Sequence, residues 1–134
     1  WNVTGLTTGQ SYTYQVKAVN GAVSSGYSNQ VTANTPSVPP IPTNLTATAV
    51  RPPGSSTDTV TLRWTDTPNE TGYMIQRAGD ALFSTGTNTV TVPANTVTIQ
   101  QTRLASGRKY FYRIQASNTA GYSGWSRTVS LITP

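Results

Sequence analysis

The chain has 134 residues, with nine Lys and Arg against four Asp and Glu, and a net charge of +5. It has no Cys and no His, which excludes disulfide scaffolds, Cys or His metal sites, and catalysis by a thiol or an imidazole. No apolar run approaches the roughly 20 residues of a membrane span, so no membrane insertion is expected. An initiator Met and a signal sequence are absent, so targeting information is expected to be absent or removed. Thr occurs 25 times, and this β-branched residue favours an all-β chain.

Residues 1–36 are a partial copy of the last part of the chain. They align without a gap to residues 99–134 at an offset of 98, with 14 identical pairs. These pairs include Leu6/Leu104, Gly9/Gly107, Tyr12/Tyr110, Tyr14/Tyr112, Ala18/Ala116, Asn20/Asn118, Gly26/Gly124, Ser28/Ser126 and Pro36/Pro134. A period of this length is a whole domain rather than a solenoid repeat. Residues 1–36 are therefore expected to be the C-terminal strands of one module, with the chain either cut from a longer array or completed by another chain.

A Pro-rich stretch over 37–43 follows, and residues 44–134 are expected to be one complete module. Proline fixes φ and donates no hydrogen bond, so 37–43 is predicted to be a short, stiff linker.

Alternating apolar and polar residues then predict about seven short strands. The expected strands are 44–50, 59–65, 73–77, 88–92, 96–101, 109–117 and 127–133, and 80–84 is an ambiguous short edge strand. The residues assigned to the core are Trp64, Tyr73, Ile75, Leu104, Tyr110, Tyr112 and Ile114, and Val97 is also placed inside. Short strands separated by turns every 8–12 residues predict an immunoglobulin-like two-sheet sandwich.

Several motifs carry a family resemblance. They are Pro42-Thr-Asn-Leu45 before the first strand, Trp64 in the second, Tyr73-Met-Ile75 in the third, and Leu104-Ala-Ser-Gly-Arg-Lys-Tyr110 before the sixth. The last motif recurs as Leu6-Thr-Thr-Gly-Gln-Ser-Tyr12. The module resembles a fibronectin type III domain over 37–134, and residues 1–36 resemble the end of another. In that pattern Leu fills the core, Gly turns the chain, and the Tyr hydroxyl reaches back to the backbone of the turn.

Catalysis is not expected. The four acids are Asp58, Asp66, Glu70 and Asp80, all in or beside predicted turns, where capping explains them. The resemblance also implies a non-catalytic module, and no catalytic residue, cofactor or metal site is predicted.

The candidate contacts with a ligand or partner lie mainly in the loop 120–127. Aromatic residues dominate interface hot spots, so the candidates are Tyr122, Trp125, Arg127 and, in the partial module, Tyr27. The competing interpretation is packing. A Trp-Ser pair resembles the Trp-Ser repeats of cytokine-receptor modules of this family, and it implies that Trp125 stacks on Arg113. Tyr122 is expected to be more exposed than Trp125.

Basic residues around the last two strands suggest a second candidate, a polyanion site. They are Arg103, Arg108, Lys109, Arg113 and Arg127. They form no run of three, so general solubility is the alternative explanation. No nucleic-acid-binding motif is present, and nucleic acid is not an expected partner.

Three functions remain open. The first is a non-catalytic spacer, scaffold or adhesion module of an extracellular or cell-surface protein, with neighbouring modules, other chains, glycans or a cell surface as partners. The second is an accessory module of a secreted polysaccharide-degrading enzyme. The third is a filament subunit completed by strand exchange, because the apolar residues of 1–36 need a second sheet to cover them.

Overall fold

A computed structural model describes all of residues 1–134. It divides into two compact units, Trp1–Ser37 and Val38–Pro134. Both are built from strands and turns, and the structure contains no helix with the length and apolar character that a membrane span requires.

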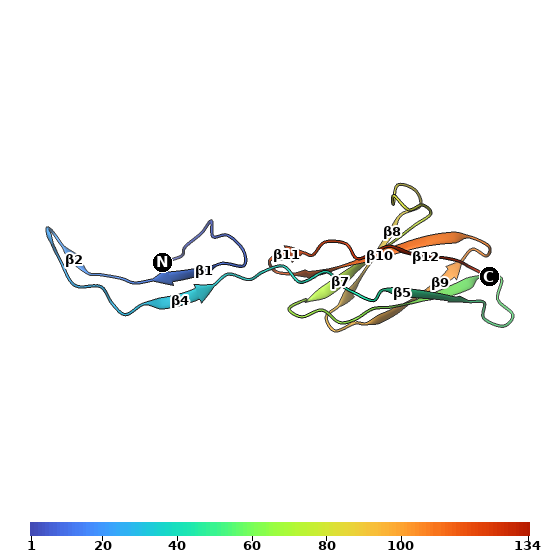
Figure 1. Ribbon diagram of the computed structural model, residues 1–134, viewed down its shortest axis with the longest axis horizontal. Coiled ribbons are helices and arrows are strands. Elements are labelled where there is room, and N and C mark those ends of the chain that lie inside the picture. Colours follow the sequence, from blue (N-terminus) through green and yellow to red (C-terminus); the bar gives the residue numbers. More distant parts are fainter. The chain divides into compact units, whose positions relative to one another are not determined.

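The second unit is a sandwich of two antiparallel sheets (Figure 1). The smaller sheet has the order β5-β6-β9, with β5 at Thr46–Val50, β6 at Asp58–Arg63 and β9 at Thr98–Leu104. The larger sheet has the order β11-β10-β7-β8, and β12 also pairs with β10. Its strands are β7 (Gly72–Ala78), β8 (Asn88–Pro93), β10 (Lys109–Asn118), β11 (Gly121–Tyr122) and β12 (Val129–Ile132). The all-β, two-sheet sandwich predicted from the sequence is confirmed.

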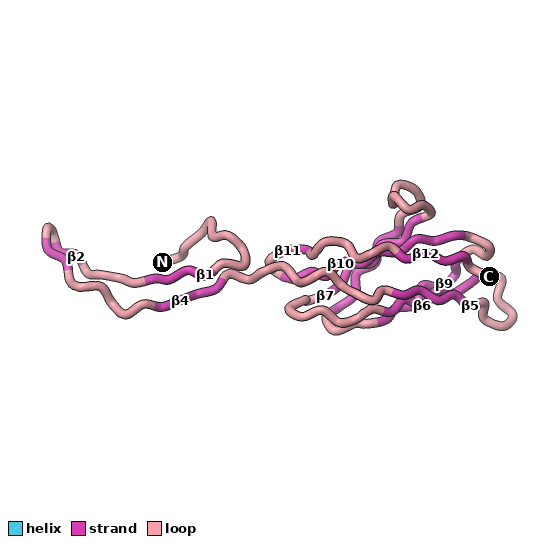
Figure 2. Tube along the Cα trace, viewed as in Figure 1, coloured by secondary structure: helices cyan, strands magenta, loops and turns pink.

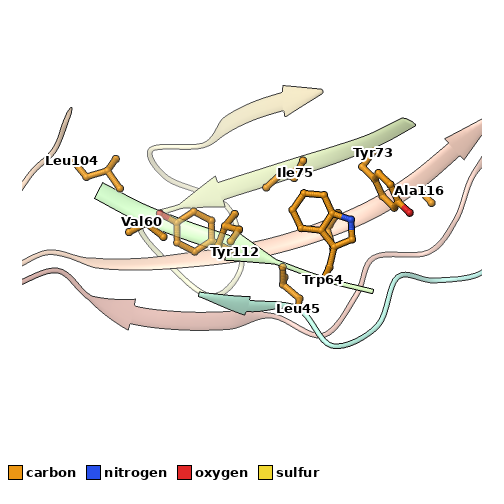
Figure 3. Packing of buried hydrophobic residues seen from close by; sticks show 10 residues of the cluster. Leu45, Val60, Trp64, Tyr73, Ile75, Leu104, Tyr112 and Ala116 are labelled. Atoms are coloured by element: carbon orange, nitrogen blue, oxygen red, sulfur yellow. The ribbon is translucent and has the colours of Figure 1, made fainter. Parts of the chain in front are cut away.

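The core lies between these two sheets (Figure 3). Its buried members are Leu45, Val60, Leu62, Trp64, Tyr73, Ile75, Leu104, Tyr112, Ile114 and Ala116. Alternation along β6, β7 and β10 explains most of the set, because every second side chain points to the same face of a sheet. Trp64, only 5% exposed, packs edge-on against the Tyr73 ring with centroids 5.5 Å apart. Tyr110 is half-buried at the margin of this cluster, so it supports the core rather than filling it.

Three local predictions differ from the structure. Residues 80–84 form a turn rather than an edge strand, because the Asp80 carboxylate accepts hydrogen bonds from the main chain of the turn itself. Val97 is 40% exposed rather than inside, because it lies before the start of β9, where alternation does not yet apply. The first strand also begins later than expected, at Thr46, because Asn44 has a φ of +56° and interrupts the extended backbone.

Residues 38–45 pack onto the second unit. Pro39, Pro42 and Leu45 are buried. A Cβ at Gly124 would lie 3.0 Å from Ile41 Cδ1, so the glycine allows the apolar side chain to approach the main chain closely. The Pro-rich segment is therefore held against the sandwich by apolar contacts.

The first unit consists of a long, two-stranded arrangement (Figure 2). Strand β1 (Ser11–Tyr14) pairs with β4 (Val31–Asn34), and β2 (Val19–Asn20) pairs with β3 (Val23–Ser24). Its side chains are mostly exposed, and Val16 reaches 70%. Its counterpart Ile114 is completely buried, because a second sheet faces β10, whereas the first unit has only the strand pairs β1-β4 and β2-β3.

The repeated residues make the same hydrogen bonds in both units. The Tyr12 hydroxyl accepts from Thr7 N at 2.9 Å, and the Tyr110 hydroxyl accepts from Ala105 N at 3.2 Å. The expected return of the Tyr hydroxyl to the turn is therefore present twice. The repeated sequence thus encodes a local backbone pattern that does not depend on the second sheet.

Candidate functional site

The loop before the last strand is held by Ser123 and Ser126, through hydrogen bonds that the sequence did not predict. Ser123 N donates to Ala116 O, and Ser126 N donates to Ile114 O, each at 2.8 Å. Each serine hydroxyl also accepts from a β10 amide, from Ala116 N at 2.9 Å and from Ile114 N at 3.1 Å. These bonds continue the hydrogen-bond ladder along β10 over the segment between β11 and β12, which has no regular strand pairing. Ser25 and Ser28 make the equivalent bonds in the first unit, which explains why both positions are identical in the repeat.

The loop places Trp125 over Arg113 on the outer face of the larger sheet. The guanidinium carbon of Arg113 lies 4.3 Å from the Trp125 ring and 4.0 Å from the Phe83 ring. Gln76 on the neighbouring strand accepts from Arg113 Nε at 2.8 Å and from Nη2 at 2.5 Å. Arg113 is thus held between two aromatic rings, with a neutral amide in the plane of its guanidinium.

Phe83 comes from the turn between β7 and β8. Asp80 organises this turn, since its carboxylate accepts from the main-chain N–H groups of Leu82, Ser84 and Thr85. Thr85 Oγ1 also donates to it at 2.6 Å. These bonds, that of the Thr85 hydroxyl first, hold the pKa of Asp80 well below its usual range. The turn carries Phe83 at a φ of +57° onto Arg113, a contact that strand alternation cannot predict.

The other candidate contacts take no part in the stack of Phe83, Arg113 and Trp125. Tyr122 in β11 is 56% exposed, whereas Trp125 is half-buried. Tyr27 in the first unit is 62% exposed, with Lys17 Nζ 5.5 Å from its ring. Arg127 is exposed and lines a shallow cavity of about 390 Å³ with residues 42–45. The geometry therefore uses Trp125 in packing and leaves the Tyr122 ring exposed.

The five basic residues named as a candidate polyanion site have different surroundings. Arg113 is enclosed in the stack, Arg127 lines the shallow cavity, and Arg103 is an exposed residue of β9 with a φ of +59°. Of the five, only Arg108 and Lys109 line the same cavity. Arg77, which is not one of the five, lines it as well. Arg77 lies in β7, after the core residues Tyr73 and Ile75. The pairing of β7 with β10 brings it to the cavity that Arg108 and Lys109 line.

Each of the four side-chain carboxylates accepts a hydrogen bond within the fold. Asp58 is fully buried, and Arg51 Nε donates to its Oδ1 at 2.9 Å. That bond, with a further one from Ser106, lowers the pKa of Asp58. Asp66 accepts from the Tyr73 hydroxyl, and Glu70 accepts from Asn95 N. No cluster of three or more acids, His or Cys that could hold a metal ion is present.

Comparison with known proteins identifies a family with this architecture. A sequence model of the fibronectin type III domain matches residues 40–132. Chitinase A1 of Niallia circulans is 36% identical over 143 residues, which span 98% of this chain and 18% of that protein. Ephrin type-B receptor 2 of Coturnix japonica is 30% identical over 128 residues, spanning 86% of this chain and 12% of the receptor. The chain thus spans less than a fifth of the length of these relatives.

Solved structures show the same fold. The chicken CNTN1 FN1-FN3 domains superpose with a TM-score of 0.64 at 22% identity, covering 96% of this chain and 44% of that one. A segment of two fibronectin type III domains from chicken tenascin gives a TM-score of 0.61 at 21% identity, covering 96% and 68%. The FN5 domain of Drosophila Lar gives 0.56 at 26% identity, covering 72% and 98%. The matched residues, the two-sheet sandwich and its core together establish that this chain belongs to the fibronectin type III family.

Proposed function

We propose that the chain is a non-catalytic spacer or scaffold region of an extracellular or cell-surface multidomain protein, with neighbouring modules as its main partners. One observation carries the proposal: the sequence and the hydrogen bonds of residues 1–36 repeat in 99–134 at one domain period. Residues 1–36 are accordingly the C-terminal strands of a partial module, and residues 44–134 are a complete one. Domains of this family are generally non-catalytic modules.

The contacts of the Pro-rich segment support a spacer role. Ile41 packs on Gly124, and Val38 Cγ1 would lie 3.4 Å from a Cβ at Gly121. Because φ is fixed at each proline, such a segment has little freedom to bend. A stiff segment held on the following sandwich limits the directions in which the chain can approach that sandwich.

A second candidate is an accessory module of a secreted polysaccharide-degrading enzyme. The 36% identity with chitinase A1, over nearly the whole chain, favours it. It is tested by fusing the chain to a chitinase catalytic domain and measuring the hydrolysis of insoluble and soluble chitin. Faster hydrolysis of the insoluble form alone supports the accessory role, whereas equal rates with and without the chain contradict it.

The spacer proposal is tested by size-exclusion chromatography with light scattering on the whole chain. The expected result is a monomer. Larger assemblies that disappear when residues 1–37 are deleted contradict the spacer role and favour the filament alternative, in which another chain covers the exposed face of β1 and β4.

An adhesive role is tested separately with a glycan array and a cell-adhesion assay. Tyr122→Ala removes an exposed aromatic ring, and Arg127→Asn places there the residue that the repeat has at position 29. A signal that both variants retain excludes these side chains as adhesive contacts. A signal lost with Tyr122→Ala alone assigns the contact to that ring.

A further inference from the structure

A second cavity lies in the complete module, at the end where β7 turns into β8 and β9 turns into β10. Its volume is about 510 Å³. The lining residues are Arg77, Gly79, Gly86, Ala105, Arg108, Lys109 and Tyr110. Three of them are cations, and none is an acid.

Neutral groups contact two of these cations, Arg77 and Lys109. Arg77 Nη1 donates to Gln101 Oε1 at 3.0 Å, and the Arg77 guanidinium carbon lies 5.5 Å from the Tyr110 ring. Lys109 Nζ lies 5.2 Å from the Phe111 ring. The one ion pair of the structure joins Arg51 to Asp58 and involves none of the three. The charges of Arg77 and Lys109 are therefore positioned by neutral groups, and none of the three cations is paired with a carboxylate.

The acid nearest in sequence to the cavity does not serve these cations. Asp80 directly follows Gly79, but its two oxygens accept hydrogen bonds from residues of its own turn. Both oxygens of Asp80 are thus hydrogen-bonded within the turn and not to the cations of the cavity.

The internal repeat indicates that the fold does not require this charge. Tyr110 corresponds to Tyr12, and both hydroxyls accept the same hydrogen bond from a turn amide. Arg108 and Lys109 correspond to Gln10 and Ser11, which are neutral. The same turn therefore forms with and without the two charges.

We propose that this cavity binds an anionic group of an acidic polysaccharide. Arg77, Arg108 and Lys109 surround the sulfate or carboxylate. Gly79 and Gly86 carry no side chain, so they leave room beside the cations for the sugar ring that bears the anion. The proposal goes beyond the spacer function, which needs no ligand, and its failure leaves that function standing.

Other occupants fit less well. A second copy of the chain has only four carboxylates, and each already accepts a hydrogen bond within its own fold. Sequence-independent binding of single-stranded nucleic acid combines cations with open aromatic faces for base stacking. Here cations already lie over the rings of Tyr110 and Phe111.

The test uses the whole chain and measures binding by isothermal titration at about 0.05 M and about 0.5 M salt. The probes are heparin, which carries sulfates, and polygalacturonate, which carries carboxylates. Dextran serves as the neutral polysaccharide, and duplex DNA and polyglutamate serve as other polyanions. The test variant is Arg108→Gln with Lys109→Ser, which places the residues of the first unit in the cavity. The matched control is Lys17→Gln with Arg63→Gln, which removes two charges outside the cavity.

We expect heparin or polygalacturonate to bind in a salt-dependent manner, and the test variant to weaken binding about tenfold or more. The control should weaken it less than about threefold. Which of the two probes binds more tightly identifies the anionic group. Equal losses in the two variants, or binding of DNA or polyglutamate as tight as that of both polysaccharides, overturns the proposal. Absence of binding to either acidic polysaccharide overturns it as well.

Discussion

Two buried tyrosines of the core differ in what their hydroxyl groups contact. The Tyr73 hydroxyl accepts from Thr67 N at 2.8 Å and donates to Asp66 Oδ1 at 2.7 Å. The Tyr112 hydroxyl is buried and has no hydrogen-bond partner. Burial raises the pKa of Tyr112 to about 12, because the charged form loses its hydration. Strand alternation places both side chains inside, but only tertiary packing gives one hydroxyl partners and leaves the other without any.

These tyrosines make a matched pair of substitutions. We expect Tyr112→Phe to leave the free energy of unfolding unchanged within about 0.5 kcal/mol or to raise it, since an unpaired polar atom is removed. Tyr73→Phe should lower it by about 1–3 kcal/mol, since the Thr67 amide loses its acceptor. Urea unfolding at pH 7 measures both. A larger loss for Tyr112→Phe than for Tyr73→Phe contradicts the assignment.

The same residue predicts a response to alkaline pH. The folded-state pKa of Tyr112, about 12, lies above its ordinary value of 10.0. The unfolded chain therefore releases this proton first, and the contribution is complete below about pH 10 and lost as pH rises toward 12. Unfolding midpoints measured between pH 8 and pH 11 should fall less in Tyr112→Phe than in the parent chain. Parallel curves would count against this prediction.

Trp64 tests the core at a single position. Trp64→Ala should lower the free energy of unfolding by about 3–5 kcal/mol, because a large side chain against Tyr73 is replaced by a cavity. Trp64→Phe should cost clearly less, since it keeps a ring there and removes the buried, unpartnered Nε1. Urea midpoints that match the parent within error for Trp64→Ala would refute its place in the core.

At the scale of elements, the turn between β7 and β8 shows where sequence reasoning fails. Its residues 80–84 suggest a short strand, but Asp80 binds three main-chain amides of the turn. Local hydrogen bonds of this kind compete with strand pairing. The turn then places Phe83 on Arg113, and the three-residue stack with Trp125 joins two loops to the centre of β10.

Asp80→Asn should loosen this turn, because a neutral amide has one acceptor oxygen where the carboxylate has two. Amide hydrogen exchange of Leu82, Ser84 and Thr85 should quicken, while that of the β10 core stays slow. In the parent chain the same exchange should quicken under acid. The folded-state pKa of Asp80 lies below its ordinary value of 3.8, so the stabilisation is present above about pH 4 and is lost as pH falls through the lowered value. Unchanged exchange in the variant would contradict a capping role.

At the scale of the whole molecule, the same repeated residues have two different environments. Ile114 and Ala116 are fully buried in the second unit. Their counterparts Val16 and Ala18 are exposed in the first. The core buried by the second unit should therefore supply most of the cooperative stability of the chain.

Deletion of residues 1–37 tests this expectation. The shortened chain keeps the entire core cluster, so its thermal midpoint should stay within about 2 °C of the parent value. Circular dichroism and differential scanning calorimetry measure it, and Trp64→Ala in the shortened chain serves as a destabilised reference. A drop of about 5 °C or more would mean that the first unit contributes to the stability of the second.

By itself the sequence determined the all-β class, the sandwich, most strand positions and the family, because alternation, turn residues and the repeat are local signals. It also anticipated the stack of Trp125 on Arg113. Tertiary structure alone decided that Arg77 lines one cavity with Arg108 and Lys109, and that Arg103 and Arg127 do not line it. It also decided that Phe83 completes the stack on Arg113. The physical reason is that strand alternation fixes which face a side chain takes, whereas the neighbours on that face come from strand pairing and turn geometry over long sequence separations.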